Sequence, residues 1–183
     1  MDYFEKSQAV KEEIKADSNL VSLIANHING NAPLEKIGRG TMNVVYRVGQ
    51  TDSGLWVALR ENVVWGKKPE QYPAVACVYN SYCLEAERLP DAPAFCIGGT
   101  CNEKPFLLVE DVTEGDAYTP QHIGGGEKRV HLVKGNNIRT RAVDLGNDDP
   151  HHGVDDDTDF EIIMGTFDIT RLKYFSLDAR LRL

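Results

Sequence analysis

Two closely spaced glycines between apolar segments are the most informative feature of this sequence. Residues 37–48 read IGRGTMNVVYRV, with Gly38 and Gly40 near the start and Val45 shortly after them. Glycine lets backbone amides approach anionic oxygens closely, because it has no Cβ atom to keep a ligand away. Val45 adds an apolar surface for a planar base. The segment therefore predicts a nucleotide-phosphate site, with an ordinary turn between strands as the alternative.

A cation and a carboxylate follow at positions that suit phosphate binding. Arg60 ends the segment WVALR, and its guanidinium can donate to two phosphate oxygens at once. Glu85 lies in a segment of helical composition, where its carboxylate can orient that guanidinium. Taken singly, these residues also fit an exposed strand position and a solvated helix face. Their order behind the glycine pair favours a phosphate site.

Short strands and one helix are expected to hold these residues. Runs of apolar and β-branched residues, bounded by Gly, Pro, Asn and Asp, predict strands. The expected strands cover residues 34–38, 44–48, 55–59, 95–98 and 106–109. A helix is expected within residues 69–89, most clearly over 82–89, with Pro90 and Pro93 ending it.

The flanking segments complete an α+β chain. Residues 1–33 carry apolar side chains at helical spacing with a break at Asp17, so one or two amphipathic helices are expected there. Residues 34–112 are expected to form a five-stranded antiparallel sheet with its helix. Residues 113–183 are expected to form a smaller part. Its predicted elements are a hairpin over 129–145, an acidic loop over 147–159 and a helix over 160–175.

Composition limits the partners. The formal net charge is −8, with acidic residues gathered in the last third, which disfavours binding to nucleic acid or to anionic lipid. The N-terminus lacks the pattern of a signal peptide, so a cytoplasmic location is expected, with uncleaved secretion into a host cell as an alternative. The four cysteines form no CxxC pair and are interpreted as free thiols. A monomer is expected.

Residues 34–115 resemble the protein-kinase-like superfamily, which also includes aminoglycoside phosphotransferases. The segment IGRGTMNVVYRV resembles its glycine-rich loop, WVALR its third strand, and CLEAERL its orienting helix. The segment PFLLVEDVTEG resembles its fifth strand running into the hinge, and VDLG at residues 143–146 resembles its DFG motif. The resemblance implies that the chain binds ATP and Mg²⁺.

The resemblance assigns roles to particular residues. Arg60 and Glu85 would act as the catalytic cation and its orienting carboxylate, and Asp144 would be catalytic and hold the metal. The nucleotide would lie against a larger set drawn from the loop, the third strand and the hinge. That set is Ile37, Gly38, Gly40, Val45, Ala58, Arg60, Glu110, Asp111 and Val112.

The sequence also departs from the family pattern. Arg60 stands where the family usually has Lys, and some phosphotransferases of the wider group resemble it in carrying Arg there. In the register of the catalytic loop, Gly124 replaces the catalytic Asp and Arg129 the metal-binding Asn. The chain also lacks the length for a full helical lobe. This resembles the minimal kinases that some bacteria inject into host cells.

Three functions follow from these features. The first is a minimal protein Ser/Thr kinase that acts on a host protein, such as the chaperone that one group of these kinases targets. The second is a pseudokinase that binds a partner without transferring phosphate, which Gly124 and Arg129 favour. The third is a small-molecule phosphotransferase of the aminoglycoside type, which ranks last because a reduced lobe offers little material for an acceptor pocket.

Overall fold

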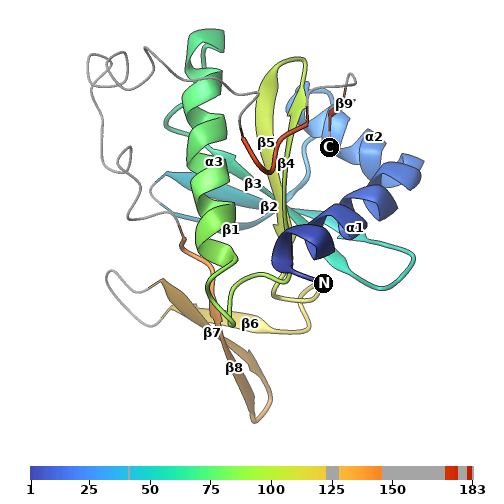
Figure 1. The fold of residues 1–183 in the computed structure, drawn as a ribbon. Coiled ribbons are helices and arrows are strands. Elements are labelled where there is room, and N and C mark those ends of the chain that lie inside the picture. The colour runs from blue at the N-terminus through green and yellow to red at the C-terminus, as the bar shows by residue number, and fades with distance from the viewer. Residues whose placement is uncertain (41, 123–127, 146–171, 177–180, 183) are drawn as a thin grey trace.

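The computed structural model describes residues 1–40, 42–122, 128–145, 172–176 and 181–182. Figure 1 shows an α+β arrangement in which helices lie on both sides of a central sheet, with a second, smaller sheet below it. The α+β class predicted from the sequence is confirmed. In the described ranges, no helix has the length and apolar character needed to cross a bilayer.

The central sheet is antiparallel throughout, in the order β1-β2-β3-β5-β4-β9. Its strands are β1 (Glu35–Arg39), β2 (Asn43–Gln50), β3 (Trp56–Asn62), β4 (Cys96–Cys101), β5 (Lys104–Glu110) and β9 (Leu181–Arg182). The five predicted strands are confirmed. The short strand β9 was not predicted, and it pairs with the edge of the sheet at β4.

Helices α1 (Tyr3–Ala16) and α2 (Ser18–Ile28) cover one face of this sheet. The predicted break between them is confirmed, because the Asp17 carboxylate accepts hydrogen bonds from the first free amides of α2. Asp2 and Glu5 form a capping box at the start of α1. The apolar residues of the two helices, among them Ile14 and Ile24, pack on alternate residues of β3, β4 and β5.

The opposite face of the sheet, called here the α3 face, lies against helix α3 (Tyr72–Ala86), which follows a 3₁₀ turn, η1 (Pro69–Gln71). The helix begins well before the segment 82–89 that the sequence marked most clearly. Seven of its residues are buried, around much of its circumference, so its first half shows no clear alternation of apolar and polar residues. After β5 the chain packs closely on the first residue of β3, because a Cβ at Gly115 would lie 2.4 Å from the Trp56 indole.

The second sheet contains β6 (Thr119–His122), β7 (Arg129–Lys134) and β8 (Asn137–Ala142), paired in that order. The predicted hairpin is confirmed as β7 and β8. Strand β6 was not predicted, because its sequence TPQH is polar and includes a proline. Tyr118, Val130 and Leu132 form its small core, and Val112 and Val143 pack against them.

The described C-terminal residues 172–176 lie across α3 and β4. Tyr174 is buried, its ring packs edge-on against Phe4, and its carbonyl accepts from the Gly98 amide. A Cβ at Gly98 would lie 2.4 Å from the Phe175 ring, so glycine is required for this contact. Residues 172–175 form a turn and irregular chain, so the predicted helix is wrong there. The rest of that helix and the acidic loop 147–159 lie outside the described residues.

All four cysteines are free thiols, as predicted, and three of them are buried. Burial raises the pKa of the Cys83 thiol well above its usual value. The three buried thiols, Cys83, Cys96 and Cys101, therefore act as small apolar groups in the two core clusters that cover the faces of the central sheet.

Candidate functional site

The glycine loop joins β1 to β2 as a tight hairpin. Gly38 pairs with Val45 and Arg39 with Val44, and the Gly40 amide donates to the Asn43 carbonyl at 2.8 Å. The sequence predicted that the amides of both glycines point toward a ligand. In this structure the Gly40 amide instead closes the loop. Thr41 lies outside the described residues.

Neither loop glycine is required by the described part of the fold. Neither has a positive φ angle, so an L-residue could adopt both backbone conformations. A Cβ at Gly38 would lie 3.8 Å from the Val45 Cβ, and a Cβ at Gly40 would lie 3.9 Å from the Asn43 carbonyl oxygen. Both are ordinary van der Waals distances. Contacts with the described neighbours therefore do not account for the two glycines.

Arg60 lies on the α3 face, next to this loop. It pairs across the sheet with Val45, which follows the loop on β2. Its side chain is only 11% exposed and donates to the Val143 carbonyl at 3.1 Å. It also forms an ion pair with Asp144, at 3.6 Å between Nη2 and Oδ1. The structure thus brings together two residues that the sequence predicted as one site.

The apolar residues predicted to hold the base share this face. Ala58 precedes Arg60 by two residues on β3, so both side chains point to the same side of the sheet. Ile37 and Val45 pack against the same core cluster as Ala58. Ile37, Val45 and Arg60 therefore lie on one face beside the glycine loop, whereas Ala58 is 1% exposed and lies in the core beneath them.

Glu85 does not have the predicted partner. The sequence assigned it to Arg60, but its side chain pairs with Lys128. Arg60 meets a different residue of the same helix, because its guanidinium lies 4.7 Å from the centre of the Tyr82 ring. The Tyr82 hydroxyl also donates to the Val143 carbonyl at 3.1 Å. Tyr82, one turn before Glu85, thus occupies the place that the prediction gave to the carboxylate.

Lys128 is a member of the site that the sequence prediction missed. Its carbonyl accepts hydrogen bonds from the amides of Val143 at 2.8 Å and Asp144 at 3.0 Å. Its side chain reaches α3 at Glu85. The only signal in the sequence was its position directly before the predicted hairpin, which does not reveal contact with residues 143–144.

The three predicted hinge residues lie where the two sheets meet. Glu110 forms an ion pair with Arg141 of β8, and Val112 packs in the core of the second sheet. The Asp111 amide donates to the Trp56 carbonyl at 2.9 Å, so it has a partner within the chain. Contact of this segment with a base remains a prediction.

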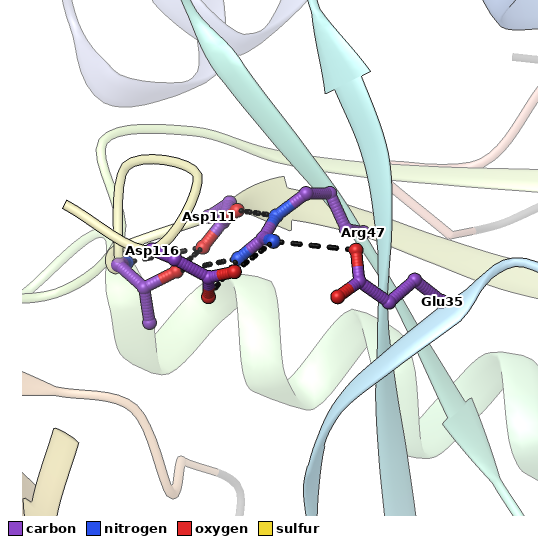
Figure 2. Close-up of polar contacts among 5 residues, drawn as sticks. Glu35, Arg47, Asp111 and Asp116 are labelled. Atoms are coloured by element: carbon purple, nitrogen blue, oxygen red, sulfur yellow. Dashed lines mark hydrogen bonds and ion pairs between the residues drawn. The ribbon is translucent and has the colours of Figure 1, made fainter. Parts of the chain in front are cut away.

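Asp111 belongs to the most extensive polar network of the described chain, shown in Figure 2. Its carboxylate is 1% exposed and accepts from Arg47 Nε at 2.9 Å and from the Thr113 amide at 3.0 Å. Arg47 also donates to both carboxylate oxygens of Asp116, to Glu35 and to the Thr113 hydroxyl. All three guanidinium nitrogens are therefore engaged. We call this network the Arg47 latch, because it ties β2 to the segment that follows β5.

The charges of the latch reinforce each other. Hydrogen bonding to Asp116 and Asp111 raises the pKa of Arg47, although burial opposes this. The same guanidinium holds the pKa of the exposed Asp116 carboxyl below its usual value. The sequence prediction missed the latch, because Arg47 and its two aspartates are far apart in the chain and only the fold brings them together.

A surface depression of about 380 Å³ lies away from the candidate site. It is lined by Tyr3, Lys6 and residues between 87 and 94, and none of the predicted site residues lines it. The described residues contain no group of three His, Cys, Asp or Glu side chains arranged to hold a metal. The His- and Asp-rich residues 148–157 and Gly124 lie outside the described ranges.

Comparison of the chain with protein-family models, with curated proteins and with solved structures finds no match. The candidate site therefore depends on its own geometry. Its members are the glycine loop, the apolar surface beside it, Arg60 with Asp144, and Lys128 with Glu85.

Proposed function

We propose that this chain binds ATP with Mg²⁺ on the α3 face and transfers the γ-phosphoryl group to a Ser or Thr hydroxyl of a protein. One observation carries the proposal. Arg60 and Asp144, from distant parts of the sequence, meet at 3.6 Å beside a loop with two glycines. The kinase-like fold with a reduced second lobe belongs to the same proposal, since it explains that meeting.

The described residues fit a magnesium nucleotide. The loop leaves space at both glycines, where a phosphate can approach the backbone more closely than a side chain would allow. Asp144 is 54% exposed, and a carboxylate oxygen is the ligand type that Mg²⁺ prefers. A bound magnesium ion supplies neutralisation of the phosphate charge.

The proposed mechanism assigns each residue a limited task. Arg60 donates to phosphate oxygens and fixes their position, since its guanidinium is already held in place by the Val143 carbonyl and the Tyr82 ring. Ile37 and Val45, which are partly exposed, contact the base and exclude water from that side, with the buried Ala58 packed beneath them. Catalysis then comes from positioning and from stabilisation of charge.

A protein acceptor suits this site better than a small molecule. The described residues between 113 and 145 form a three-stranded sheet and include no helix that could enclose an acceptor. A protein substrate brings its hydroxyl on its own flexible segment and needs no closed pocket. A host protein such as a chaperone, met in the cytoplasm, is the acceptor that the resemblance to minimal kinases implies.

A binding module without transfer activity is the second candidate. Arg129, in the position assigned to a metal-binding Asn, instead forms an ion pair with Asp91 at 2.7 Å. Among the described residues, Asp144 does not belong to a group of three His, Cys, Asp or Glu side chains that could hold a metal. These observations favour nucleotide or protein binding alone.

The glycine loop gives a test that separates binding from folding. Gly40→Ala is expected to weaken ATP binding by about tenfold, because a methyl group would hold the phosphates away from the backbone. Its melting temperature should stay the same or rise slightly, since the backbone conformation suits alanine and the site has room for Cβ. Calorimetry and thermal unfolding measure the two effects.

Gly135→Ala is the matched control. Gly135 lies in the turn between β7 and β8 with a φ angle of +58°, and open space surrounds its missing Cβ. Alanine there should lower stability by about 1 kcal/mol through backbone strain and leave ATP affinity unchanged. Equal ATP affinity for the wild type and for Gly40→Ala would count against the loop as the phosphate site.

A further inference from the structure

Lys128 is fixed at two points, by its backbone and by its side chain. Its carbonyl accepts from the amides of both Val143 and Asp144, so its backbone lies directly beside the proposed metal-binding residue. Its ammonium group pairs with Glu85 on α3, and both side chains are partly buried. Lysine ammonium groups usually remain in solvent. The ion pair with Glu85 instead holds the Lys128 ammonium group at a defined place.

Lys128 lies beside the same segment that the other cation of the site contacts. Arg60 reaches Val143 and Asp144 from β3, with contacts of 3.1 Å to the Val143 carbonyl and 3.6 Å to the Asp144 carboxylate. The backbone carbonyl of Lys128, the residue before β7, accepts from the amides of the same two residues. The helix residues that face the two cations, Tyr82 and Glu85, lie one turn apart. The Arg60 guanidinium and the Lys128 backbone therefore contact one short segment that ends at Asp144, and the two cations meet α3 at side chains one turn apart.

Each cation of this cluster pairs with a carboxylate of the described chain. Arg60 pairs with Asp144, and Lys128 pairs with Glu85. An ammonium group has three N–H donors, so a lysine that holds one carboxylate can also donate to a phosphate oxygen. A second cation next to a first one is suited to a chain of phosphates, because each phosphoryl group adds negative charge.

We infer that Lys128, positioned by Glu85, is a second phosphate-binding cation, so that the site prefers nucleoside di- and triphosphates to monophosphates. This inference rests on the proposed function, since it assumes that a nucleotide binds beside Arg60. It names the class of ligand within that function and a residue that the family resemblance does not include.

The test measures the affinities of AMP, ADP and ATP by calorimetry in the presence of EDTA, so that the result does not depend on magnesium or on activity. Lys128→Ala is expected to weaken ADP and ATP binding by about tenfold and to leave AMP binding nearly unchanged. Lys128→Arg should retain most of the affinity for ATP, because it keeps the positive charge. Glu85→Gln should reduce the preference for ATP over AMP by a smaller factor.

Lys134→Ala is the control. Lys134 lies at the exposed turn of the same hairpin, 5.7 Å from the centre of the Tyr118 ring, and its loss should leave the affinities of all three nucleotides unchanged. If Lys128→Ala does not fold, Lys128→Gln serves in its place, because its amide can still donate to Glu85. The same selective loss for ADP and ATP is expected of it.

Two results would overturn the inference and leave the proposed function in place. One is equal loss of AMP, ADP and ATP binding in the Lys128 variants, which would mean that Lys128 only holds the segment before β7 against α3. The other is unchanged binding of all three. A wild-type chain that binds none of the nucleotides, with or without magnesium, would overturn the proposed function itself.

Discussion

Replacing Arg47 with alanine is expected to lower the free energy of unfolding by about 3–5 kcal/mol, because it leaves a buried carboxylate without its cation. Asp111 is 1% exposed, and in the described structure its carboxylate forms an ion pair with Arg47. The same substitution disconnects β2 from Thr113 and Asp116. Urea denaturation followed by circular dichroism measures the loss.

Asp116→Ala is the appropriate comparison for this variant. Its side chain is 71% exposed, so its removal takes two hydrogen bonds from Arg47 but buries no unpaired charge. The loss of stability should be much smaller than for Arg47→Ala. Similar losses for the two variants would show that the buried Asp111 pair is not the main contribution of the latch.

The pH dependence of the latch follows from Asp116. Arg47 lowers the pKa of this carboxyl in the folded protein, mainly by hydrogen bonding to it. The stabilisation is therefore complete above the unfolded pKa of about 3.9 and is lost as the pH falls through the lower folded value. In the Arg47→Ala variant, NMR titration should return the Asp116 pKa toward its usual value.

Asp144→Ala is expected to reduce magnesium-dependent transfer of phosphate to protein by at least about a hundredfold, with the fold intact. The carboxylate is half exposed and its loss removes one ion pair from Arg60, which keeps its bond to the Val143 carbonyl. Incorporation of label from γ-labelled ATP into a protein substrate measures transfer. Circular dichroism checks the fold.

Glu114→Ala is the matched control, because Glu114 is a similarly exposed carboxylate that pairs with Arg139 away from the site. Its transfer activity should equal that of the wild type. Undiminished transfer by Asp144→Ala would refute the role of Asp144. A wild-type chain that binds ATP but incorporates no label would favour the binding module over the kinase.

The features predicted correctly from the sequence depend on residues close together in the chain. The break at Asp17 follows from a capping side chain, and the five strands follow from short apolar runs between turn residues. The hairpin of β7 and β8 follows from its turn around Gly135, whose φ angle is positive. In these segments, local preference and tertiary packing favour the same conformation.

The features that were missed depend on contacts between distant segments. Strand β6 has a polar sequence and is a strand because it pairs with β7. The first half of α3 is buried on more than one side, so it carries no helical periodicity. The predicted partner of Glu85 was wrong because the sequence does not show which residue of α3 faces Arg60. In the structure that residue is Tyr82, one turn before Glu85, and Glu85 pairs with Lys128. The Arg47 latch likewise requires the register of β2 against β3 and of β3 against β5.

Part of the candidate site was predicted from residue chemistry, part from the family resemblance, and part was found only in the structure. Gly38, Gly40 and Arg60 were identified from what glycine and guanidinium groups do with phosphate. Asp144 was identified through the resemblance to kinases, and the structure places it against Arg60. Lys128 has no local pattern and was found only through its hydrogen bonds to residues 143 and 144.

Titration of the wild-type chain with ATP in the presence of magnesium, followed by isothermal calorimetry, tests the central claim most directly. We predict saturable binding of one nucleotide per chain, weakened by at least about tenfold in Arg60→Ala, since a guanidinium bound to phosphate contributes a charge-assisted hydrogen bond. A titration without binding heat at millimolar ATP, confirmed by an unchanged melting temperature, would contradict it.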